Sequence, residues 1–391
     1  MLNERIRSSE GKIEMGNLYK NKLSGSRIGI VFGAFAPCHI GHLEVILKAK
    51  KENDGCVVIV CGEDGDCGEP FGLDVYRRFR YMRELFADDD QIYVVMAAGQ
   101  GIPQKETEWK PWLEIINLKI VDSLQHSDAQ KIWYTGKRVQ AEALEKESSD
   151  EVHLVDTSLY PVSGLNIRND ALRYFNAIAL PFRRAFTKKV LVLGAPSGGK
   201  TTLVKDLAKL YSCPYSFEYS RQYQEESNVN DFELDGMDYQ RLVTGQFQLN
   251  RDTIADPASQ GMAILDTDVM VTKVYARLGA EDEDYAITPE EYAIVEQSAN
   301  AFIARQVWDL ILVVPPTLKY VDDGYRNMEF SEDAFLTTIH EMMLEEIANS
   351  GNLDKVVMLD AKGVDDKDEY SYYARYKQAK EAIDTLMGHN Q

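Results

Sequence analysis

A glycine-rich loop in the middle of the chain has the residue types that bind a nucleotide phosphate chain. The sequence follows G-x-x-x-x-G-K-[ST] between an apolar run at 190–193 and a helical pattern at 203–210. Backbone N–H groups of such a loop turn towards a phosphate, and the positive end of the helix adds to the attraction. A glycine-rich turn without a ligand would not explain a lysine and a threonine just inside the helix. The residues expected to bind the nucleotide are Gly194, Ser197, Gly198, Gly199, Lys200, Thr201 and Thr202.

Acidic residues at the ends of two later segments are expected to complete this site. A buried run at 261–265 leads into Asp266 and Asp268, an acidic pair that would hold Mg²⁺ opposite Thr201, with Asp266 as the predicted ligand. Glu218 ends a predicted strand at 213–219, where small-substrate kinases place a base for the attacking hydroxyl. Asp268 is the second candidate for that base, and an ion-paired surface residue is the alternative interpretation of Glu218.

A loop after the predicted strand at 310–314 contains Asp323-Gly-x-Arg326. An arginine that is delivered when such a loop closes stabilises the transferring phosphoryl group, and the aspartate can bind a substrate hydroxyl. The alternative interpretation is an ordinary Asp-Gly turn.

A second set of reactive residues lies near the start of the chain, between a predicted strand at 28–32 and a helix at 43–51. Gly33, Phe35, His39, Gly41 and His42 follow the pattern G-x-F-x-P-x-H-x-G-H. Two imidazoles three residues apart at a helix start lie on one face and can hydrogen-bond a triphosphate whose α-phosphorus is attacked. Capping histidines are the simpler interpretation. A zinc site is disfavoured, because zinc needs more ligands than two histidines.

Strands and helices alternate along both halves of the chain. Further strands are expected at 56–60, 91–96, 131–134 and 152–155, and further helices at 75–86, 111–122, 237–255 and 369–387. This order predicts an α/β protein of two doubly wound parallel sheets, with ligands at the carboxyl ends of the strands. We expect an N-terminal extension at 1–26, a first domain at 27–180, a linker at 181–188 and a second domain at 189–391.

Composition and charge exclude several classes of protein. Hydrophobic residues make up 45% and charged residues 27% of the 391-residue chain, and no apolar run is long enough to cross a membrane. Of the net charge of −20, residues 1–187 carry −3 and the remainder −17, which argues against a nucleic-acid partner. The five cysteines show no C-x-x-C spacing, and the first 22 residues lack the apolar core of a signal peptide, so a cytoplasmic location is expected. The sequence is compatible with a homo-oligomer but does not specify one.

The histidine motif resembles that of the H-x-G-H nucleotidyltransferases, whose second signature is roughly Ile-Ser-Ser-Thr-x-Ile-Arg. Residues 162–168 match it at Ser163, Ile167 and Arg168 and depart from it at Gly164 and Leu165, where two hydroxyls are missing. Lys137 and Arg138 follow a predicted strand in the segment 134–138, which is expected to face the adenine or the phosphates. Arg77, Arg78 and Arg80 lie on a predicted helix and are interpreted as a solvated face; the alternative is that one of them pairs with a substrate phosphate.

The two motifs together, over about residues 27–345, resemble the bifunctional NadR-type proteins. In that family a nicotinamide-mononucleotide adenylyltransferase precedes a ribosylnicotinamide kinase; a repressor domain that members often carry has no counterpart before residue 27. The resemblance implies ATP, nicotinamide riboside and nicotinamide mononucleotide (NMN) as substrates and Mg²⁺ as cofactor. It implies catalytic roles for His39, His42, Arg168, Lys200, Glu218, Asp268 and Arg326. ATP would also contact Gly33, Phe35, Gly41, Lys137, Arg138 and Ser163, and the riboside Tyr219, Arg221, Tyr223 and Asp323.

Two alternatives remain. One is a kinase and adenylyltransferase that acts on another vitamin precursor. The other is a nucleotide sensor in which the adenylyltransferase domain is weak, since the Gly164-Leu165 departure removes two hydroxyls from the phosphate site.

Overall fold

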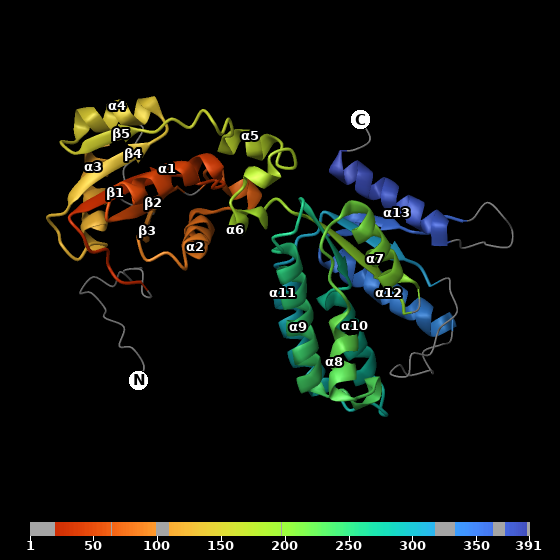
Figure 1. Ribbon diagram of the computed structural model, residues 1–391. Coiled ribbons are helices and arrows are strands. Elements are labelled where there is room, and N and C mark those ends of the chain that lie inside the picture. Colours follow the sequence, from red (N-terminus) through yellow and green to blue (C-terminus); the bar gives the residue numbers. More distant parts are fainter. Residues whose placement is uncertain are drawn as a thin grey trace. The chain divides into compact units, whose positions relative to one another are not determined.

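The computed structural model describes residues 20–63, 65–98, 109–196, 198–316, 333–362 and 372–388. The chain forms two compact units, which divide between Phe186 and Thr187 (Figure 1). Each unit contains one parallel sheet with helices on both faces, which confirms the predicted fold class. The expectations for Ser197, Asp323 and Arg326 lie outside the described residues.

The sheet of the first unit has five parallel strands in the order β3-β2-β1-β4-β5. Their bounds are Arg27–Gly33 (β1), Gly55–Cys61 (β2), Ile92–Ala97 (β3), Gln130–Thr135 (β4) and Glu151–Leu154 (β5). Every residue of β2 is buried, as expected for a central parallel strand with helices on both faces. The connection from β3 to β4 crosses to the other side of β1, so the strand order reverses between β1 and β4. Ligands bind such sheets at the carboxyl ends of the two strands that flank this reversal.

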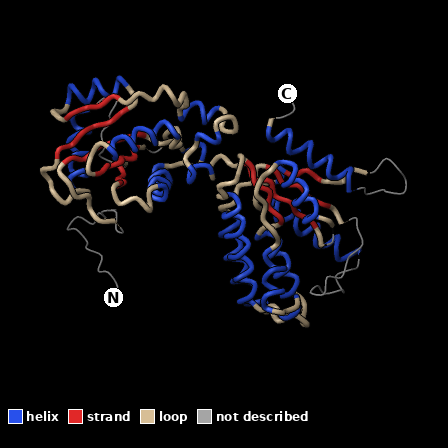
Figure 2. The backbone as a smooth tube through the Cα atoms, in the orientation of Figure 1, coloured by secondary structure: helices blue, strands red, loops and turns tan. Residues whose placement is uncertain are grey.

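Helices cover both faces of this sheet. Helices α1 (Ile40–Lys51), α2 (Val75–Leu85) and α6 (Leu180–Arg183) share one apolar core with it, and α3 (Trp109–Asp122) and α4 (Arg138–Glu147) share the other. Figure 2 shows the alternation of helix, strand and loop that produces these layers. Each helix contributes apolar side chains at helical spacing, such as Ile116 and Ile120 of α3.

The segment predicted as a linker, residues 181–188, is not a free connector in the structure. Phe182 and Phe186 are buried in the apolar core of the first unit, and Phe182 packs edge-to-face on Tyr81 of α2. Lys188 already begins the first strand of the second unit. The sequence suggested a linker because the segment contains a proline and several basic residues, whereas its two phenylalanines determine where it packs.

Part of the predicted N-terminal extension also belongs to the first unit. Leu23 is buried against α3, and its backbone exchanges hydrogen bonds with Ser123 and Gln125 at 2.9 Å each. Residues 1–19 lie outside the described part of the chain.

The second unit has four parallel strands in the order β7-β6-β8-β9. They span Lys188–Gly194 (β6), Met262–Asp266 (β7), Leu310–Val314 (β8) and Val356–Met358 (β9). Helices α7 (Lys200–Tyr211) and α13 (Tyr372–Met387) pack on one face, and α10 (Val269–Ala280) and α12 (Asp333–Asn349) on the other. The phosphate-binding motif therefore follows a central strand, β6.

Four helices of this unit form an additional layer, which we call the helical cover: α8 (Tyr219–Ser227), α9 (Gly236–Ile254), α10 and α11 (Pro289–Ile303). They share an apolar core of their own, which includes Tyr239, Val243, Phe247, Val295 and Ala299. Figure 1 shows these helices grouped beside the sheet of the second unit. The cover follows the phosphate loop in the chain and so can form a wall of the same site.

The strand predicted at 213–219 is wrong. Only one bridge, Tyr215 with Ile264, pairs this segment with β7, and α8 already begins at Tyr219. Pro214 has no N–H to donate and uses only its carbonyl, which accepts from Ile264 at 3.1 Å. The segment therefore runs along the edge of the sheet without extending it.

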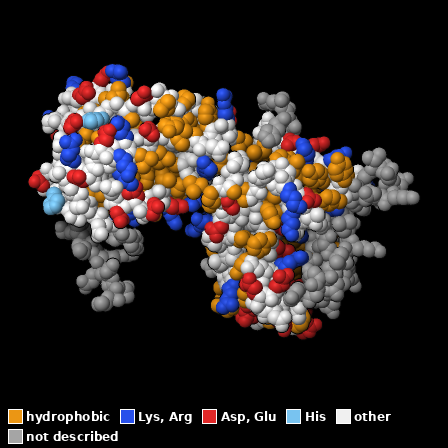
Figure 3. All heavy atoms as spheres, in the orientation of Figure 1, with side chains coloured by type: hydrophobic (Ala, Val, Ile, Leu, Met, Phe, Trp, Pro, Cys, Tyr) orange, Lys and Arg blue, Asp and Glu red, His pale blue; other side chains and the backbone are white. Residues whose placement is uncertain are grey.

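The surface carries charges of both signs. Figure 3 shows basic and acidic side chains interspersed over both units on the face that it draws. Within the described ranges, no helix combines the length and apolar character needed to cross a bilayer.

Candidate active sites

The turn after β1 brings the two histidines of the first unit together. His39 is the N-cap residue of α1, and its ring stacks on that of His42 with a centroid separation of 3.8 Å and an interplanar angle of 28°. Phe35 has the unusual φ of 49° and places its buried ring edge-on to His42 at 5.0 Å. Gly33 ends β1 and Gly41 lies in the first turn of α1. The predicted pattern thus forms one cluster at the carboxyl edge of the sheet.

Both imidazoles are held in their neutral form. Burial lowers the pKa of His39 to about 4, with a contribution from the positive charge of Lys137. Burial also lowers the pKa of His42 well below its ordinary value, assisted by His39 and Lys137. Each Nδ1 atom is buried and has no hydrogen-bond partner among the described residues. Two imidazoles with unused nitrogen atoms beside a lysine can donate hydrogen bonds to an anionic ligand, whose negative charge also favours their protonated form.

Lys137 and Arg138 begin α4, as expected for residues facing this edge of the sheet. Both side chains are exposed, and the backbone N–H of Lys137 donates to the hydroxyl of Thr135 at 3.1 Å. The influence of Lys137 on both imidazoles places its charge near the histidine pair.

The second signature of the first unit forms the short helix α5 (Gly164–Asn169). Ser163 caps it by accepting from the N–H of Asn166 at 3.1 Å, and Arg168 Nη1 donates to the carbonyl of Ala36 at 2.5 Å. Arg168 is thereby connected to the loop that carries the histidines.

Gly164 has a packing reason to depart from the family signature. A Cβ atom at this position would lie 3.1 Å from Arg168 Nη1 and 3.2 Å from the Ala36 carbonyl oxygen. Any side chain would therefore crowd the contact between α5 and the histidine loop. Leu165, the other departure, is 60% exposed, so nothing in this packing requires a leucine there.

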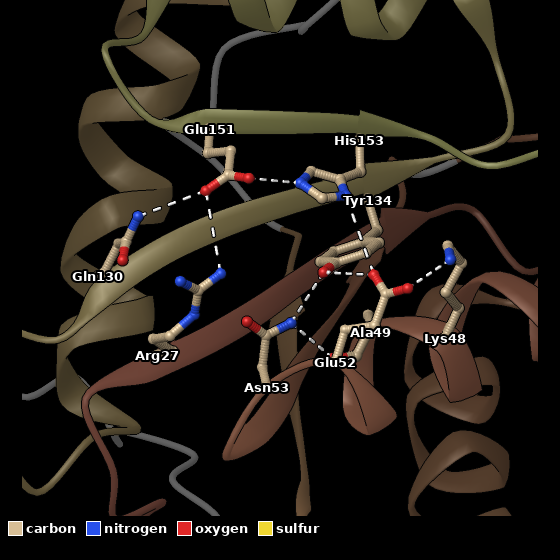
Figure 4. Close-up of polar contacts among 9 residues, drawn as sticks. All are labelled: Arg27, Lys48, Ala49, Glu52, Asn53, Gln130, Tyr134, Glu151 and His153. Carbon is tan, nitrogen blue, oxygen red and sulfur yellow. Dashed lines mark hydrogen bonds and ion pairs between the residues drawn. The ribbon is translucent and has the colours of Figure 1, made fainter.

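Tyr134 does not face the phosphates, contrary to the expectation for segment 134–138. Its hydroxyl donates to Glu52 Oε2 and accepts from Asn53 Nδ2, both at 3.0 Å, and its ring lies 4.8 Å from that of His153 (Figure 4). Figure 4 also shows Glu151 bonded to His153 and reaching towards Gln130 and Arg27. This network lies at the C-terminal end of α1, about 18 Å along the helix from the histidines. It anchors α1 to β4 and β5.

The prediction of a solvated arginine face is wrong for one of its three residues. Arg77 and Arg80 are exposed, but Arg78 is fully buried and donates to Asp66 Oδ1 at 2.6 Å and to the Cys61 carbonyl at 3.4 Å. A buried, paired arginine cannot be distinguished by sequence from its solvated neighbours one and two residues away. It ties the loop after β2 to the carboxyl end of that strand.

In the phosphate loop of the second unit, the described residues 194–196 and 198–201 have the backbone geometry that the motif predicts. Gly194 has a φ of 148°, and a Cβ atom there would lie 2.3 Å from the carbonyl oxygen of Val314, so only glycine fits. Gly199, with a φ of 79°, directly precedes α7. Lys200 Nζ donates to the Ala195 carbonyl at 3.0 Å, and Thr202 is exposed in the first turn of α7. Gly198 accepts from the buried Arg375 of α13 at 3.1 Å. The C-terminal helix therefore supports the loop directly.

Thr201 and Asp266 provide the oxygen atoms that a divalent cation needs. The Thr201 hydroxyl donates to Asp266 Oδ2 at 2.6 Å, and the buried Oδ1 of Asp266 has no partner among the described residues. Burial raises the pKa of Asp266 to about 6; Lys200 opposes this shift and Glu218 adds to it. A hydroxyl and an unpaired carboxylate oxygen beside a phosphate loop are a donor set that fits Mg²⁺.

A pocket opens beside Lys200, between the phosphate loop and the helical cover. Glu218 and Arg221, two predicted site residues, line it together with residues that sequence analysis missed. The missed residues come from α8, α9, α10 and their connections and include Gln224, Asp231, Tyr239, Leu242, Gln246, Thr267, Val271, Thr272 and Tyr275. Their spacing along α9 and α10 is the same as that of core residues, so the sequence contains no signal that separates the two.

The structure separates the two candidate bases. Glu218 lines the pocket and is the N-cap residue of α8. Asp268 is completely buried and is not among the residues that line the pocket. It caps α10 by accepting a hydrogen bond from the Met270 N–H at 2.8 Å. Burial raises the pKa of Asp268 to about 7. The geometry thus gives Asp268 a capping contact, and of the two candidates it is Glu218 that lines the pocket with Lys200.

Tyr219 and Tyr223 are not brought into the pocket with Arg221. Tyr219 packs its ring against Gly245 of α9, and its N–H donates to Gln246 Oε1 at 2.8 Å. Tyr223 is buried and its hydroxyl donates to Asp238 at 2.5 Å. Tyr219 and Tyr223 lie four residues apart on one face of α8 and attach it to α9. Arg221 lies between them in sequence and therefore points from another face, which borders the pocket.

Comparisons with known proteins agree with this arrangement. Residues 189–377 match the sequence profile of a family described as an AAA domain. The chain is 25% identical over 374 residues to the trifunctional NAD biosynthesis/regulator protein NadR of Salmonella typhimurium, and 24% identical over 371 residues to that of Escherichia coli. Each match covers 92% of this chain and 83% of the relative.

Two solved structures are similar over both units. A crystal structure of a NadR protein in complex with NR is 37% identical, with a TM-score of 0.81. Another, in complex with NAD and AMP-PNP, is 36% identical with a TM-score of 0.78. Each covers 94% of this chain and 98% of the other. The chain therefore belongs to the NadR family.

Proposed function

We propose that this chain is a two-site enzyme of NAD biosynthesis. The second unit transfers the γ-phosphoryl group of ATP to the 5′-hydroxyl of nicotinamide riboside and so makes NMN. The first unit joins the NMN phosphate to the α-phosphorus of a second ATP, which yields NAD and pyrophosphate. The observation that carries this proposal is the presence of both phosphate-handling clusters in one chain that is similar, over 94% of its length, to a NadR protein solved with NR.

The pocket of the second unit supports riboside phosphorylation. Glu218 lies beside Lys200 and would accept the proton of the attacking hydroxyl. Lys200 and the N–H groups of the phosphate loop would stabilise the negative charge of the transferring phosphoryl group. Leu242, Val271 and Tyr275 provide an apolar and aromatic wall for the pyridine end of the substrate.

Thr201 and Asp266 are the residues that would hold Mg²⁺ in this unit. Bound there, the ion would neutralise charge on the β- and γ-phosphates. The unpaired Oδ1 of Asp266 and the Thr201 hydroxyl support this assignment.

The histidine cluster of the first unit supports adenylyl transfer. A phosphate oxygen of NMN would attack the α-phosphorus as the bond to the β-phosphate breaks, so no covalent enzyme intermediate is required. His39, His42 and Arg168 would donate hydrogen bonds to the α-phosphate and the leaving pyrophosphate, and Lys137 would add positive charge. The imidazoles are neutral in the absence of ligand, and the negative charge of a bound polyphosphate would favour their protonated form. Ligand binding would thus strengthen their hydrogen bonds to the phosphates.

The test is incubation of the protein with nicotinamide riboside, ATP and Mg²⁺, with the products separated over time. We expect NMN first and NAD second, with pyrophosphate equal to NAD. NMN without NAD, also when NMN is supplied directly, would contradict the role of the first unit and favour a sensor. Absence of NMN, with phosphorylation of a flavin or pantetheine precursor, would identify a different vitamin as the substrate.

A further inference from the structure

Thr267, between the two acidic residues at the end of β7, has a backbone conformation that side chains with a branched Cβ seldom adopt. Its φ is 72°, in the left-handed region. Its N–H donates to the Val192 carbonyl of β6 and its carbonyl accepts from Asn250 Nδ2, both at 3.1 Å. These two bonds hold the backbone in the unfavourable conformation.

The residues that hold Thr267 are themselves fixed. Asn250 is buried in α9, and its Oδ1 accepts from the Ser216 hydroxyl at 2.9 Å and from Gln246 Nε2 at 3.0 Å. The Ser216 hydroxyl also accepts from the N–H of Asp266 at 3.2 Å. A buried polar network therefore joins the end of β7 to the helical cover and sets the position of Thr267.

The side-chain hydroxyl of Thr267 lacks a hydrogen-bond partner among the described residues and lies at the pocket beside Lys200. The residue is 3% exposed, it lines the pocket beside Lys200, and its hydroxyl has no partner among the described residues. Buried hydroxyls are normally paired, and strained residues cluster where a ligand is held. A valine would fill the same space without the cost of an unpaired hydroxyl, so packing alone does not account for threonine.

The neighbours of Thr267 indicate which ligand group the hydroxyl meets. Thr267 lines the pocket directly before the N-cap residue of α10, and Val271 and Tyr275 line it one turn apart on that helix. A hydroxyl both donates and accepts, as do the hydroxyls of a sugar. These three residues present a hydroxyl, an apolar side chain and an aromatic side chain to the pocket, which matches a ribose joined to a flat ring.

We propose that Thr267 is a substrate-binding residue of the second unit, whose hydroxyl forms a hydrogen bond with a ribose hydroxyl of the nucleoside that is phosphorylated. This inference rests on the proposed riboside kinase function. The strained backbone would then be the means by which a side chain directly after the metal-binding Asp266 is turned into the substrate pocket.

The test compares three single variants of the full chain. Thr267→Val keeps the branched Cβ and removes the hydroxyl, and Thr267→Ser keeps the hydroxyl. Thr253→Val is the matched control, because this threonine is buried in α9 and its hydroxyl already donates to the Leu249 carbonyl at 2.9 Å. KM and kcat are measured for nicotinamide riboside and for ATP, together with the unfolding temperature with and without the riboside.

For Thr267→Val we expect a rise of about 10-fold in KM for the riboside, no change in KM for ATP, and a smaller riboside-induced rise in unfolding temperature at the same riboside concentration. Without riboside, this variant should unfold at the wild-type temperature or above it, which a merely structural hydroxyl would not permit. Thr267→Ser and Thr253→Val should remain within about 3-fold of wild type.

An unchanged KM for the riboside in Thr267→Val would overturn the inference, as would an equal rise in both KM values. If Thr267→Val does not fold, the same result is required of Thr267→Ala. A wild-type protein that neither binds nor phosphorylates the riboside would overturn the proposed function, and this inference with it; wild-type activity with an unaffected Thr267→Val variant overturns the inference alone.

Discussion

The proposed phosphate sites of the two units contain buried groups of opposite character. The first has imidazoles, whose positive form is disfavoured by burial. The second has Asp266 near Lys200, and burial disfavours the negative form of this carboxyl group. An anionic ligand favours the charged imidazole and a cation favours the charged carboxylate. In each site the arriving ligand therefore favours the charged form that burial disfavours.

The largest effects should come from separating the two sites by mutation. Lys200→Ala removes the cation of the phosphate loop and should lower riboside phosphorylation by about 10²–10³-fold, with NAD formation from supplied NMN intact. His42→Ala should lower NAD formation by a similar factor and leave riboside phosphorylation intact. Both activities are measured on each variant by product separation. Loss of both activities in either variant would contradict the assignment of one reaction to each unit.

The next comparison distinguishes the two carboxylates of the second unit. Glu218→Gln should lower kcat for riboside phosphorylation by about 10²-fold, because it removes the proposed base. Asp268→Asn can keep the cap on α10 through its amide oxygen, so its kcat should stay within about 3-fold of wild type. Steady-state kinetics of the purified variants decides. The reverse order of effects would make Asp268 the base.

Acid should affect the stability of the two units in opposite directions. Between pH 6.5 and 4 the unfolded chain binds protons at His39 and His42 that the folded first unit does not bind, so its free energy of unfolding falls as pH falls. For His39 alone the loss is about 2 kcal/mol at pH 5. Asp268 has a raised pKa, so in the second unit the folded state binds the additional proton below about pH 7 and gains stability.

Hydrogen exchange in Mg²⁺-free buffer measures these trends for β1 and β6 separately. His39→Asn should flatten the pH dependence of the first unit. His126→Asn, at an exposed position, is the control and should leave it unchanged. Parallel slopes for the two strands would show that these buried groups do not control the pH dependence.

The smallest expected effect concerns the departure from the family signature. Gly164→Ser restores a hydroxyl but places a Cβ atom against Arg168 and the Ala36 carbonyl, so NAD formation should fall by about 10-fold. Leu165→Ser changes an exposed side chain and should alter NAD formation by less than about 2-fold. A faster Gly164→Ser enzyme would mean that the missing hydroxyl matters more than the packing.

The predictable parts of both sites are those in which backbone geometry dictates residue type. Gly194 and Gly199 have dihedral angles that favour glycine, and the spacing to Lys200 and Thr201 is fixed by one loop. Burial was harder to predict. Arg78 lies between exposed arginines and yet is fully buried, and Asp268 is a helix cap although its sequence position suggested a base.

The walls of the second pocket could not be predicted for a different reason. Leu242 and Gln246 of α9 repeat at the same helical spacing as core residues, so only the folded chain shows which of them border a space. Phe182 and Phe186 fall in the predicted linker for a similar reason. Whether a short segment is buried depends on elements distant in the sequence that pack against it, and here those elements form the core of the first unit.

The helical cover has a consequence for how this enzyme can change during evolution. Most residues that would face the substrate lie on α8, α9 and α10, whereas those that would bind the phosphates lie in the loop after β6 and at the start of α7. The first set can therefore be replaced while the second is retained. Selection can thus act on the choice of nucleoside and on the use of ATP almost independently. A chain of this design can acquire a new substrate through a few changes on α9 and α10.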